Sequence, residues 1–387
     1  MTIEDFKDIA PYDNEMFQPK LAELVKEVGF RNVVTSIIPG LDYPAFVTRL
    51  LSIDNKDDFQ KFIMQPFLEQ LERMTTSGIT MSGVQNYAGD TPYTVITNHR
   101  DIVLDVSFLN LCFLHAGEPT TEVAIGDNLL IYDWIDDLVR LNKSFIVRRN
   151  LKMKQAFEAA KHLSAYIHFA LRDKRQSIWI AQREGRTKDS NDVTQESLIK
   201  MLALSGGNSL RENIEAVNLL PTSISYEYDP NDYLKAREFL LKRRDPNFKK
   251  SQRDDLFSME TGITGYKGHV HYEVGECITP TLQALPKDIS NAEFLQVVCK
   301  LIDNAIHSGY KIYPINYISY DIAENCSTFE DKYTDAERDS VLKYIENQIA
   351  KVDVENITDE ERDFMRNSIF NMYANPLRNK LKAISND

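Results

Sequence analysis

A short segment in the first third of this 387-residue chain places a histidine and acidic residues where they could act together on a proton. The apolar run YTVIT (93–97) leads into an Asn-His-Arg-Asp turn at 98–101, and Asp105 follows it. A carboxylate that accepts a hydrogen bond from one imidazole N–H fixes the tautomer of the histidine. The other ring nitrogen is then free to act as a general base. His99 is therefore a candidate base with Asp105 or Asp101 as its partner. The alternative is a histidine that only packs or caps locally.

Two further segments follow apolar runs with cationic residues. In KSFIVRRN (143–150) the apolar run is followed by two adjacent arginines, which present a fork for a carboxylate or phosphate, although a solvated strand end is the alternative. SIWIAQ (177–182) delivers a polar turn in which a glycine permits a conformation that other residues resist. In this turn an arginine and a lysine could hold a phosphate, and a glutamate could bind a substrate hydroxyl or orient an arginine. The candidate substrate ligands are Arg148, Arg149, Glu184, Gly185, Arg186, Thr187 and Lys188.

The strands and helices that would position these residues can be read from the sequence, in which short apolar runs alternate with segments of helical periodicity. The runs at 93–97, 144–148, 177–182, 219–226 and 268–278 read as strands, and 151–172 reads as the helix between two of them. Alternation of this kind predicts an α/β fold with a mostly parallel sheet covered by helices. The carboxyl ends of such strands are where α/β sheets usually hold their sites.

Helical spacing of apolar residues predominates on both sides of this region. We expect a helical N-terminal region (1–85), a central α/β domain (86–280) and a helical C-terminal region (281–387). Ser, Thr, Asp and Asn stand at the starts of the C-terminal helices, where capping residues are favoured.

Charge and composition narrow the function classes. The net charge of −13 disfavours non-specific binding to nucleic acid. Four cysteines without a CxxC pair argue against a disulfide framework or a zinc ribbon, and two histidines on one strand do not make a zinc site. The N-terminus lacks the pattern of a signal peptide, and the most apolar stretch (106–117) is too short to span a bilayer. We expect a cytoplasmic protein, at most peripheral to the inner face of a membrane.

The order of the polar blocks resembles that of the glycerophospholipid acyltransferase superfamily. In that family a His-x4-Asp block, an arginine-ended strand, a Glu-Gly-(Thr)-Arg turn and a Pro-led strand follow one another. The corresponding residues here are the turn at 98–101, the arginines after 147, the Glu-Gly-Arg turn and the strand LLPTSISY (219–226). The Tyr-Glu pair after this strand, the basic helix after it and the strand GHVHYEVGECI look like the soluble glycerol-3-phosphate acyltransferase branch.

The resemblance implies an acyltransferase that moves a fatty acyl chain from acyl-CoA or acyl-ACP (acyl carrier protein). The acceptor would be a hydroxyl of glycerol-3-phosphate or 1-acylglycerol-3-phosphate, in phospholipid biosynthesis. His99 would be the general base, and no metal or redox cofactor is implied. The alternatives are the same chemistry on another lyso-lipid, such as a lyso-aminolipid, or a catalytically silent protein that binds lipid or acyl carrier as a scaffold.

One spacing departs from the family, because its aspartate would fall at Leu104. Asp105 lies one residue later, and an inserted residue can bulge at the helix start. Asp101 is very close in sequence to reach the far imidazole nitrogen, so we favour Asp105.

Two stretches are basic within this acidic chain: residues 140–188 hold 13 Lys/Arg against 3 acids, and residues 235–253 hold 8 against 2. The first predicts an anion site. The second contains YLKAREFLLKRR, a helix that could lie on an anionic membrane surface. A dock for an acidic carrier protein and a helix that merely covers the domain are the alternatives.

Overall fold

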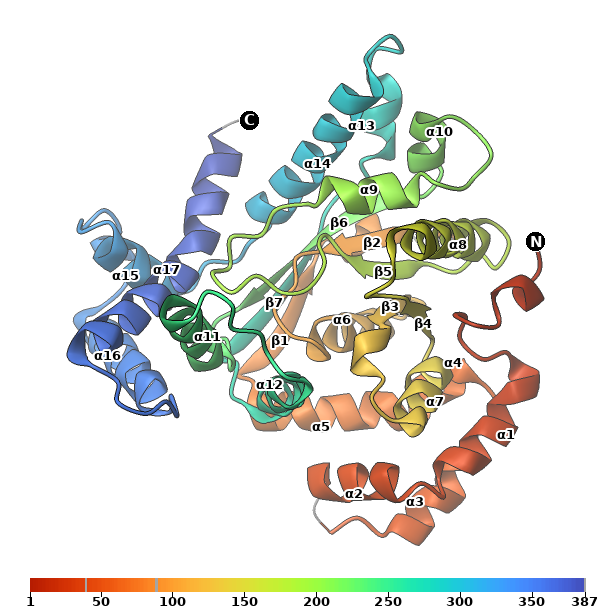
Figure 1. Ribbon diagram of the computed structural model, residues 1–387, viewed down its shortest axis with the longest axis horizontal. Coiled ribbons are helices and arrows are strands. Elements are labelled where there is room, and N and C mark those ends of the chain that lie inside the picture. The colour runs from red at the N-terminus through yellow and green to blue at the C-terminus, as the bar shows by residue number, and fades with distance from the viewer. Residues whose placement is uncertain (39, 88–89, 386–387) are drawn as a thin grey trace.

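The computed structural model describes residues 1–38, 40–87 and 90–385. Within these ranges seven strands form one sheet in the order β1-β7-β6-β2-β5-β3-β4 (Figure 1). The strands are β1 (Gly78–Ser82), β2 (Thr94–Thr97), β3 (Glu122–Gly126), β4 (Ser144–Val147), β5 (Ile178–Ala181), β6 (Leu219–Tyr226) and β7 (His269–Val274). All neighbouring pairs are parallel except β6 and β7, so the predicted mostly parallel sheet is confirmed.

Helices cover both faces of this sheet. The N-terminal helices are α1 (Asn14–Leu24), α2 (Val28–Ile37), α3 (Tyr43–Leu50), α4 (Lys56–Phe59) and α5 (Gln65–Thr75). The helices between strands are α6 (Leu104–His115), α7 (Asp133–Leu141), α8 (Met153–Arg172), α9 (Glu196–Leu202), α10 (Leu210–Glu215), α11 (Asp232–Arg244) and α12 (Gln252–Thr264). The C-terminal helices are α13 (Thr279–Ala284), α14 (Asn291–Ser308), α15 (Pro314–Ala323), α16 (Asp335–Ala350) and α17 (Asp359–Ile384).

The central strands are buried on both faces, which explains their continuous apolar sequences. All four residues of β2 and all eight of β6 are buried. Because successive side chains of a strand point to opposite faces, Ile96 packs with α8, α9 and α14, whereas Val95 packs with α5 and α6. These two apolar cores hold the sheet rigidly, and with it the loops that leave its edge.

The sheet begins earlier in the chain than the sequence suggested. We expected residues 1–85 to be helical, but the helices end at Thr75, and β1 pairs with β7 at the edge of the sheet. β3 also went unpredicted, between the strands now called β2 and β4. The division into three regions stays a prediction, although capping boxes at the starts of α14, α16 and α17 agree with the expected caps.

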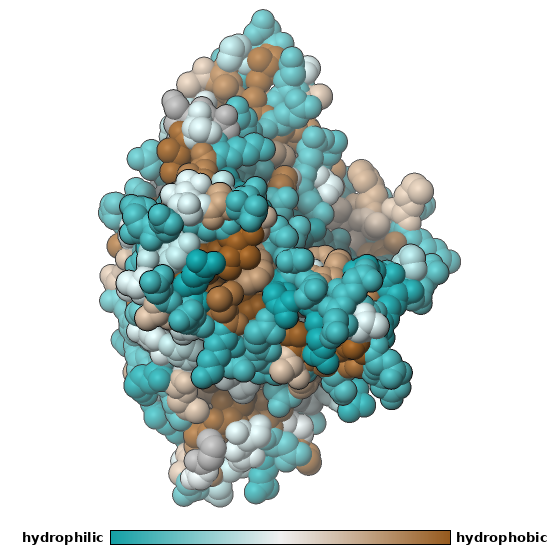
Figure 2. Space-filling model, turned by 90° about the vertical axis from the view of Figure 1, so that its left-hand side faces the viewer, coloured by the Kyte–Doolittle hydropathy of each residue, from teal (hydrophilic) through white to brown (hydrophobic). Residues whose placement is uncertain are grey.

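The C-terminal helices α15, α16 and α17 build a core of their own together with α11. Ala236 and Leu240 of α11 are buried in it, beside Ile318 and Ile369. Figure 2 views the side of the molecule on which these helices lie, and hydrophilic residues predominate on it. No helix within the described ranges has the length and apolar character needed to cross a bilayer.

The structure argues against the prediction that α11 lies on a membrane surface, because Tyr233, Ala236 and Leu240 of this helix pack into this core. Several of its basic side chains also form ion pairs with acids of the same chain. Lys235 is 3% exposed and pairs with Asp229. Arg243 lies 2.5 Å from Glu360, and Arg244 lies 2.7 Å from Glu361. The helix therefore covers the domain, as one of the alternatives proposed.

Candidate active site

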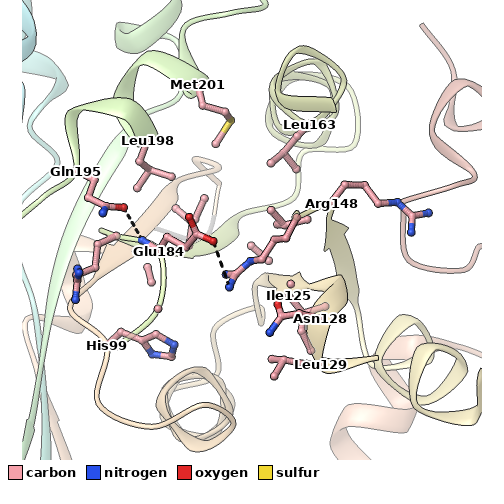
Figure 3. Close-up of a pocket in the computed structure, with 18 of the residues that line it drawn as sticks. His99, Ile125, Asn128, Leu129, Arg148, Leu163, Glu184, Gln195, Leu198 and Met201 are labelled. Carbon is pink, nitrogen blue, oxygen red and sulfur yellow. Dashed lines mark hydrogen bonds and ion pairs between the residues drawn. The ribbon is translucent and has the colours of Figure 1, made fainter. Parts of the chain in front are cut away.

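His99 and Asp105 meet at the carboxyl end of β2. His99 Nδ1 lies 2.8 Å from Asp105 Oδ2, and the imidazole and the indole of Trp179 meet in a T-shaped contact. The same carboxylate oxygen accepts from the backbone N–H of Arg100 at 2.6 Å. A carboxylate in this position makes Nδ1 the protonated nitrogen and leaves Nε2 with its lone pair. His99 points into a cavity, as Figure 3 shows, so this lone pair is available to a reacting group.

Buried side chains on either side of His99 fix the turn that carries it. The Asn98 amide donates to the carbonyl oxygen of Ile224 at 3.0 Å and accepts from its N–H at 2.8 Å, which ties the turn to β6. Arg100 forms a buried ion pair with Asp192 at 2.7 Å, and its guanidinium lies over the ring of Tyr310. The turn is therefore held to the sheet on one side and to the segment after β5 on the other.

Asp101, the alternative partner for His99, hydrogen-bonds to the backbone instead of to the imidazole. Its Oδ1 accepts from the N–H groups of Val103 and Leu104, both at 2.8 Å, and so caps the start of α6. Burial, and then the nearby Asp105 carboxylate, raises the pKa of Asp101. The extra residue between His99 and Asp105 is taken up in the loop before α6, so of the two aspartates it is Asp105 that contacts the imidazole.

One wall of the cavity, which encloses about 600 Å³, is cationic. Arg149 follows β4, and its guanidinium lies 3.7 Å from a carboxylate oxygen of Glu184. Arg186 and Lys188 follow β5 and line the same cavity. Nη1 of Arg186 is buried and has no hydrogen-bond partner among the described residues, which leaves it available to an anion.

Two glycines let the backbone adopt this arrangement. Gly185 has φ +68°, in the left-handed region that glycine favours, and its turn carries Glu184 and Arg186 on either side. Gly126, at the end of β3, serves another purpose. A Cβ there would lie 2.6 Å from Nε of Arg149 and 2.5 Å from Oδ1 of Asn128, so only glycine leaves room for both side chains.

Two of the predicted substrate ligands point elsewhere. Arg148 extends away from the cavity interior and donates to the carbonyl oxygen of Asp8 at 3.1 Å (Figure 3). Thr187 is buried, and its hydroxyl donates to Asp192 at 2.8 Å. Because Asp192 also pairs with Arg100, it links the turn at 183–188 to the turn that carries His99.

Lys188 lies between the cavity and α11. Its Nζ is 3.2 Å from Glu238, which also pairs with Lys242 and Lys250. Burial, followed by the positive charge of Arg186, lowers the pKa of Lys188 to about 7. Burial opposes ionisation of Glu238, but the lysines around it lower its pKa to about 2. An anion that entered beside Lys188 would therefore meet a cation whose charge depends on pH.

Apolar side chains line much of the rest of the cavity. Leu163, Leu198 and Met201 lie on the side away from His99, whereas Ile125 and Leu129 lie along another side (Figure 3). Small residues on the same face of α8 widen the space between these walls; they are Ala156, Ala159 and Ala160. The cavity thus offers a base, a cationic wall and room for a hydrocarbon group.

Residues 78–205 match the family model described as Acyltransferase. They form an acyltransferase domain. The resemblance drawn from the sequence is confirmed for this part of the chain. Comparison with curated protein sequences gave no match. Among solved structures, the 1-acyl-sn-glycerophosphate (LPA) acyltransferase PlsC from Thermotoga maritima is similar over 74% of this chain and 93% of its own, with 14% identity and a TM-score of 0.35.

The acyltransferase domain contains the strands that end at His99, Arg149 and Glu184. Its turn at 183–195 is also held by elements that follow the domain. Asn375 of α17 donates to the carbonyl oxygen of Asp189 at 2.7 Å, and Thr194 donates to Asp303 of α14 at 2.6 Å. The C-terminal helices therefore support the cationic wall directly.

Sequence reasoning missed three features of this candidate site. The ion pair between Arg100 and Asp192 joins two motifs that are far apart in the chain, and no rule of residue spacing predicts it. Gly126 was overlooked because β3 itself was not predicted. The alanines of α8 carried a usable signal, since their spacing of three and four residues marks one face of a helix.

Proposed function

We propose that this acyltransferase moves a fatty acyl chain from a thioester, acyl-CoA or acyl-ACP, to a hydroxyl of glycerol-3-phosphate or 1-acylglycerol-3-phosphate. The observation that carries the proposal is the hydrogen bond between His99 Nδ1 and Asp105 at the wall of a cavity that is cationic on one side and apolar on another. The cationic wall suits the phosphate of the acceptor, and the apolar walls suit the acyl chain.

In the proposed mechanism His99 Nε2 takes the proton of the acceptor hydroxyl while the hydroxyl oxygen attacks the thioester carbonyl. The C–O bond forms, and the tetrahedral intermediate then collapses with cleavage of the C–S bond. The thiolate leaves and receives the proton from the imidazolium, which returns His99 to its neutral form. Asp105 keeps the tautomer and stabilises the imidazolium. Base catalysis of this kind contributes about 10²–10⁴ in rate, and alignment of the two substrates contributes more.

The phosphate ligands that we propose are Arg149, Arg186 and Lys188, because they line the cavity together with His99. Glu184 pairs with Arg149 and would either hold this arginine in place or receive an acceptor hydroxyl. Arg148 and Thr187 are no longer proposed as direct ligands, since their polar groups bind Asp8 and Asp192. The reaction needs no metal or redox cofactor.

The catalytically silent alternative rested on the irregular spacing of His99 and Asp105. The 2.8 Å contact between them removes that reason. Another lyso-lipid acceptor, such as a lyso-aminolipid, keeps the same chemistry and differs only in what the cationic wall would bind. In either case the acceptor or product is a lipid, and we propose that the protein works reversibly at a membrane surface in phospholipid biosynthesis.

An acceptor panel tests the proposal. The full chain is incubated with one long-chain acyl thioester and each of glycerol-3-phosphate, 1-acylglycerol-3-phosphate, an unphosphorylated monoacylglycerol and a lyso-aminolipid. Free thiol is followed by absorbance and products by mass spectrometry, with His99→Ala as the control. Acyl transfer that favours the phosphorylated acceptors and disappears in His99→Ala is expected. Thiol release that is the same with and without acceptor would contradict an acyltransfer role.

A further inference from the structure

The first two turns of α8 are exposed along the wall of the active-site cavity. Met153 is 90% exposed, the most of any large hydrophobic residue described, and Phe157 is 55% exposed. Lys152, Lys154 and Lys161 are exposed beside them. We call these five residues the α8 rim. An isolated apolar residue on a surface is ordinary, but a pair of them among lysines at the mouth of a cavity is not.

The helical period makes the α8 rim continuous with the cavity. At about 100° per residue, Met153 and Phe157 fall on one stripe of α8, and Lys161 lies beside it. The neighbouring stripe carries Ala156 and Ala160, which line the cavity. The exposed Met153 and Phe157 therefore adjoin, on the helix surface, the alanines that line the cavity.

Unlike the basic residues of α11, the lysines of the α8 rim are not neutralised by ion pairs among the described residues. None of its three lysines forms an ion pair with any residue that the structure describes. Glu158 is the one acidic residue in the first three turns of this helix. In a chain whose net charge is −13, this leaves a local cationic surface that an anionic partner can approach.

We propose that the α8 rim is the surface with which the protein docks on an anionic lipid bilayer, and this inference rests on the proposed function. Met153 and Phe157 would enter the boundary between headgroups and acyl chains, while the lysines keep their ammonium groups on the lipid phosphates and bury their stems. A lipid acceptor or product would then pass between bilayer and cavity along the apolar stripe. The two exposed hydrophobic side chains favour a bilayer over an acidic carrier protein.

Co-sedimentation with vesicles tests this surface without any need for catalysis. Vesicles of phosphatidylcholine alone are compared with vesicles of equal parts phosphatidylcholine and phosphatidylglycerol, at low and high salt. We expect the wild type to bind only the anionic vesicles and to lose them at high salt, since each base contributes at most about 1 kcal/mol near the surface. Two variants address the two parts of the rim: Met153→Asp/Phe157→Asp and Lys152→Glu/Lys154→Glu. Each should partition onto vesicles at least about tenfold more weakly.

Matched controls change the same residue types elsewhere. Phe62→Asp/Met74→Asp replaces two other exposed hydrophobic residues, and Lys287→Glu/Lys343→Glu gives the same change in net charge. Both controls should bind vesicles like the wild type, and all variants should melt at the wild-type temperature. A wild type that does not sediment, rim variants that sediment normally, or controls that lose binding equally would overturn the proposal. So would rim variants that keep vesicle binding and lose only binding to purified acyl carrier protein.

Activity separates this proposal from the proposed function. None of the substituted rim residues lines the cavity, so the rim variants should retain turnover of water-soluble short-chain substrates and lose about tenfold or more on an acceptor held in vesicles. If the chain binds anionic vesicles through the rim but transfers no acyl group to any acceptor, the proposed function fails and the docking surface stands. If soluble substrates turn over but the chain never sediments, the docking surface fails and the function stands.

Discussion

The two basic segments of the chain look alike in sequence, but the cations that could meet a partner lie in only one of them. Residues 140–188 carry 13 Lys/Arg against 3 acids, and residues 235–253 carry 8 against 2. In the first segment some cations form ion pairs, but Arg186 lines the cavity and Lys154 stands exposed, and neither is ion-paired with any residue that the structure describes. In the second, Lys235, Arg243 and Arg244 are paired with acids of the same chain.

The difference shows that a run of positive charge predicts a partner only when its counter-ions are known. The C-terminal helices supply Glu360 and Glu361 to the second segment, and these acids lie more than a hundred residues further along the chain. In the first segment, Arg186 and the lysines of the α8 rim have no such counter-ion among the described residues. The first segment should therefore govern binding and catalysis, and the second should govern stability.

The largest expected effect belongs to the base that faces the cavity of the first segment. His99→Ala should lower kcat by about 10²–10⁴, because the acceptor hydroxyl loses its proton acceptor. Asp105→Asn should lower kcat by a large part of this, since an amide can present its N–H to Nδ1 and favour the wrong tautomer. Steady-state kinetics on the purified chain measures both.

Asp101→Asn is the matched control for Asp105→Asn. Its amide oxygen can still cap α6, so kcat should stay close to that of the wild type. Turnover in His99→Ala equal to that of the wild type would exclude base catalysis by this residue. A larger loss of kcat in Asp101→Asn than in Asp105→Asn would mean that the contact seen between His99 and Asp105 is not the functional one.

The next effect concerns stability in the second segment. Lys235→Met leaves the buried Asp229 carboxylate without its ion-pair partner, and the free energy of unfolding should fall by about 3–5 kcal/mol. Burial opposes ionisation of Asp229, but Lys235 lowers its pKa, so removing the lysine exposes the full cost of that burial. Urea unfolding measures the change.

The double variant Lys235→Met/Asp229→Asn should recover part of the lost stability, because no unpaired charge remains. Short-chain acyl transfer by the folded fraction should keep its acceptor KM in both variants. A raised acceptor KM at unchanged stability would mean that the second basic segment binds substrate. This result would contradict the assignment of that segment to stability alone.

The sequence supported five of the seven described strands, and the two that it missed have a common cause. β3 begins with Glu122, a charged residue that is unexpected at a buried strand position. Its carboxylate accepts from the Tyr166 hydroxyl and pairs with Lys174, both of which arrive from elsewhere in the chain. β1 is only half-buried, and what makes it a strand is its pairing with β7. In both cases the strand forms because of contacts with residues that are distant in the sequence.

The same limit applies to the site. The order of the strands sufficed to predict that His99, Arg149 and Glu184 meet, because parallel strands end at one edge of a sheet. It could not tell that Arg148 turns toward Asp8 whereas Arg149 faces the cavity, since neighbouring residues point to opposite sides. Side-chain direction at a strand end depends on the loops that surround it.

A smaller effect is expected for the cations of the first segment that contact the acceptor. Arg186→Ala or Arg149→Ala should raise the KM for a phosphorylated acceptor about 10–100-fold, because a hydrogen bond to a charged group contributes roughly 1.5–3 kcal/mol. Lysine should replace Arg186 poorly if the contact is bidentate. Arg148→Ala is the matched control, and its KM should not change. Equal KM values in all three alanine variants would mean that the acceptor lacks a phosphate or binds elsewhere.

Lys188 should make acceptor binding depend on pH by a few-fold. Its lowered pKa of about 7 means that the ammonium is charged below this pH and neutral above it. The KM for a phosphorylated acceptor should therefore rise as the pH increases through 7. Lys188→Arg keeps its charge throughout, so the ratio of its KM to that of the wild type should fall with pH. A ratio that does not change with pH would show that Lys188 does not contact the acceptor in a titrating form.

The smallest effect should come from the exposed end of the second segment. Arg243 and Arg244 pair with Glu360 and Glu361 on the protein surface, where water and salt screen the attraction. Arg243→Gln should therefore change the free energy of unfolding by less than about 1 kcal/mol. The triple reversal of Lys242, Arg243 and Arg244 to glutamate should leave binding to anionic vesicles as it is in the wild type, although it changes the net charge more than Lys152→Glu/Lys154→Glu does. If the triple variant instead leaves the vesicles while the α8 rim variant stays bound, the roles assigned to the two basic segments are reversed.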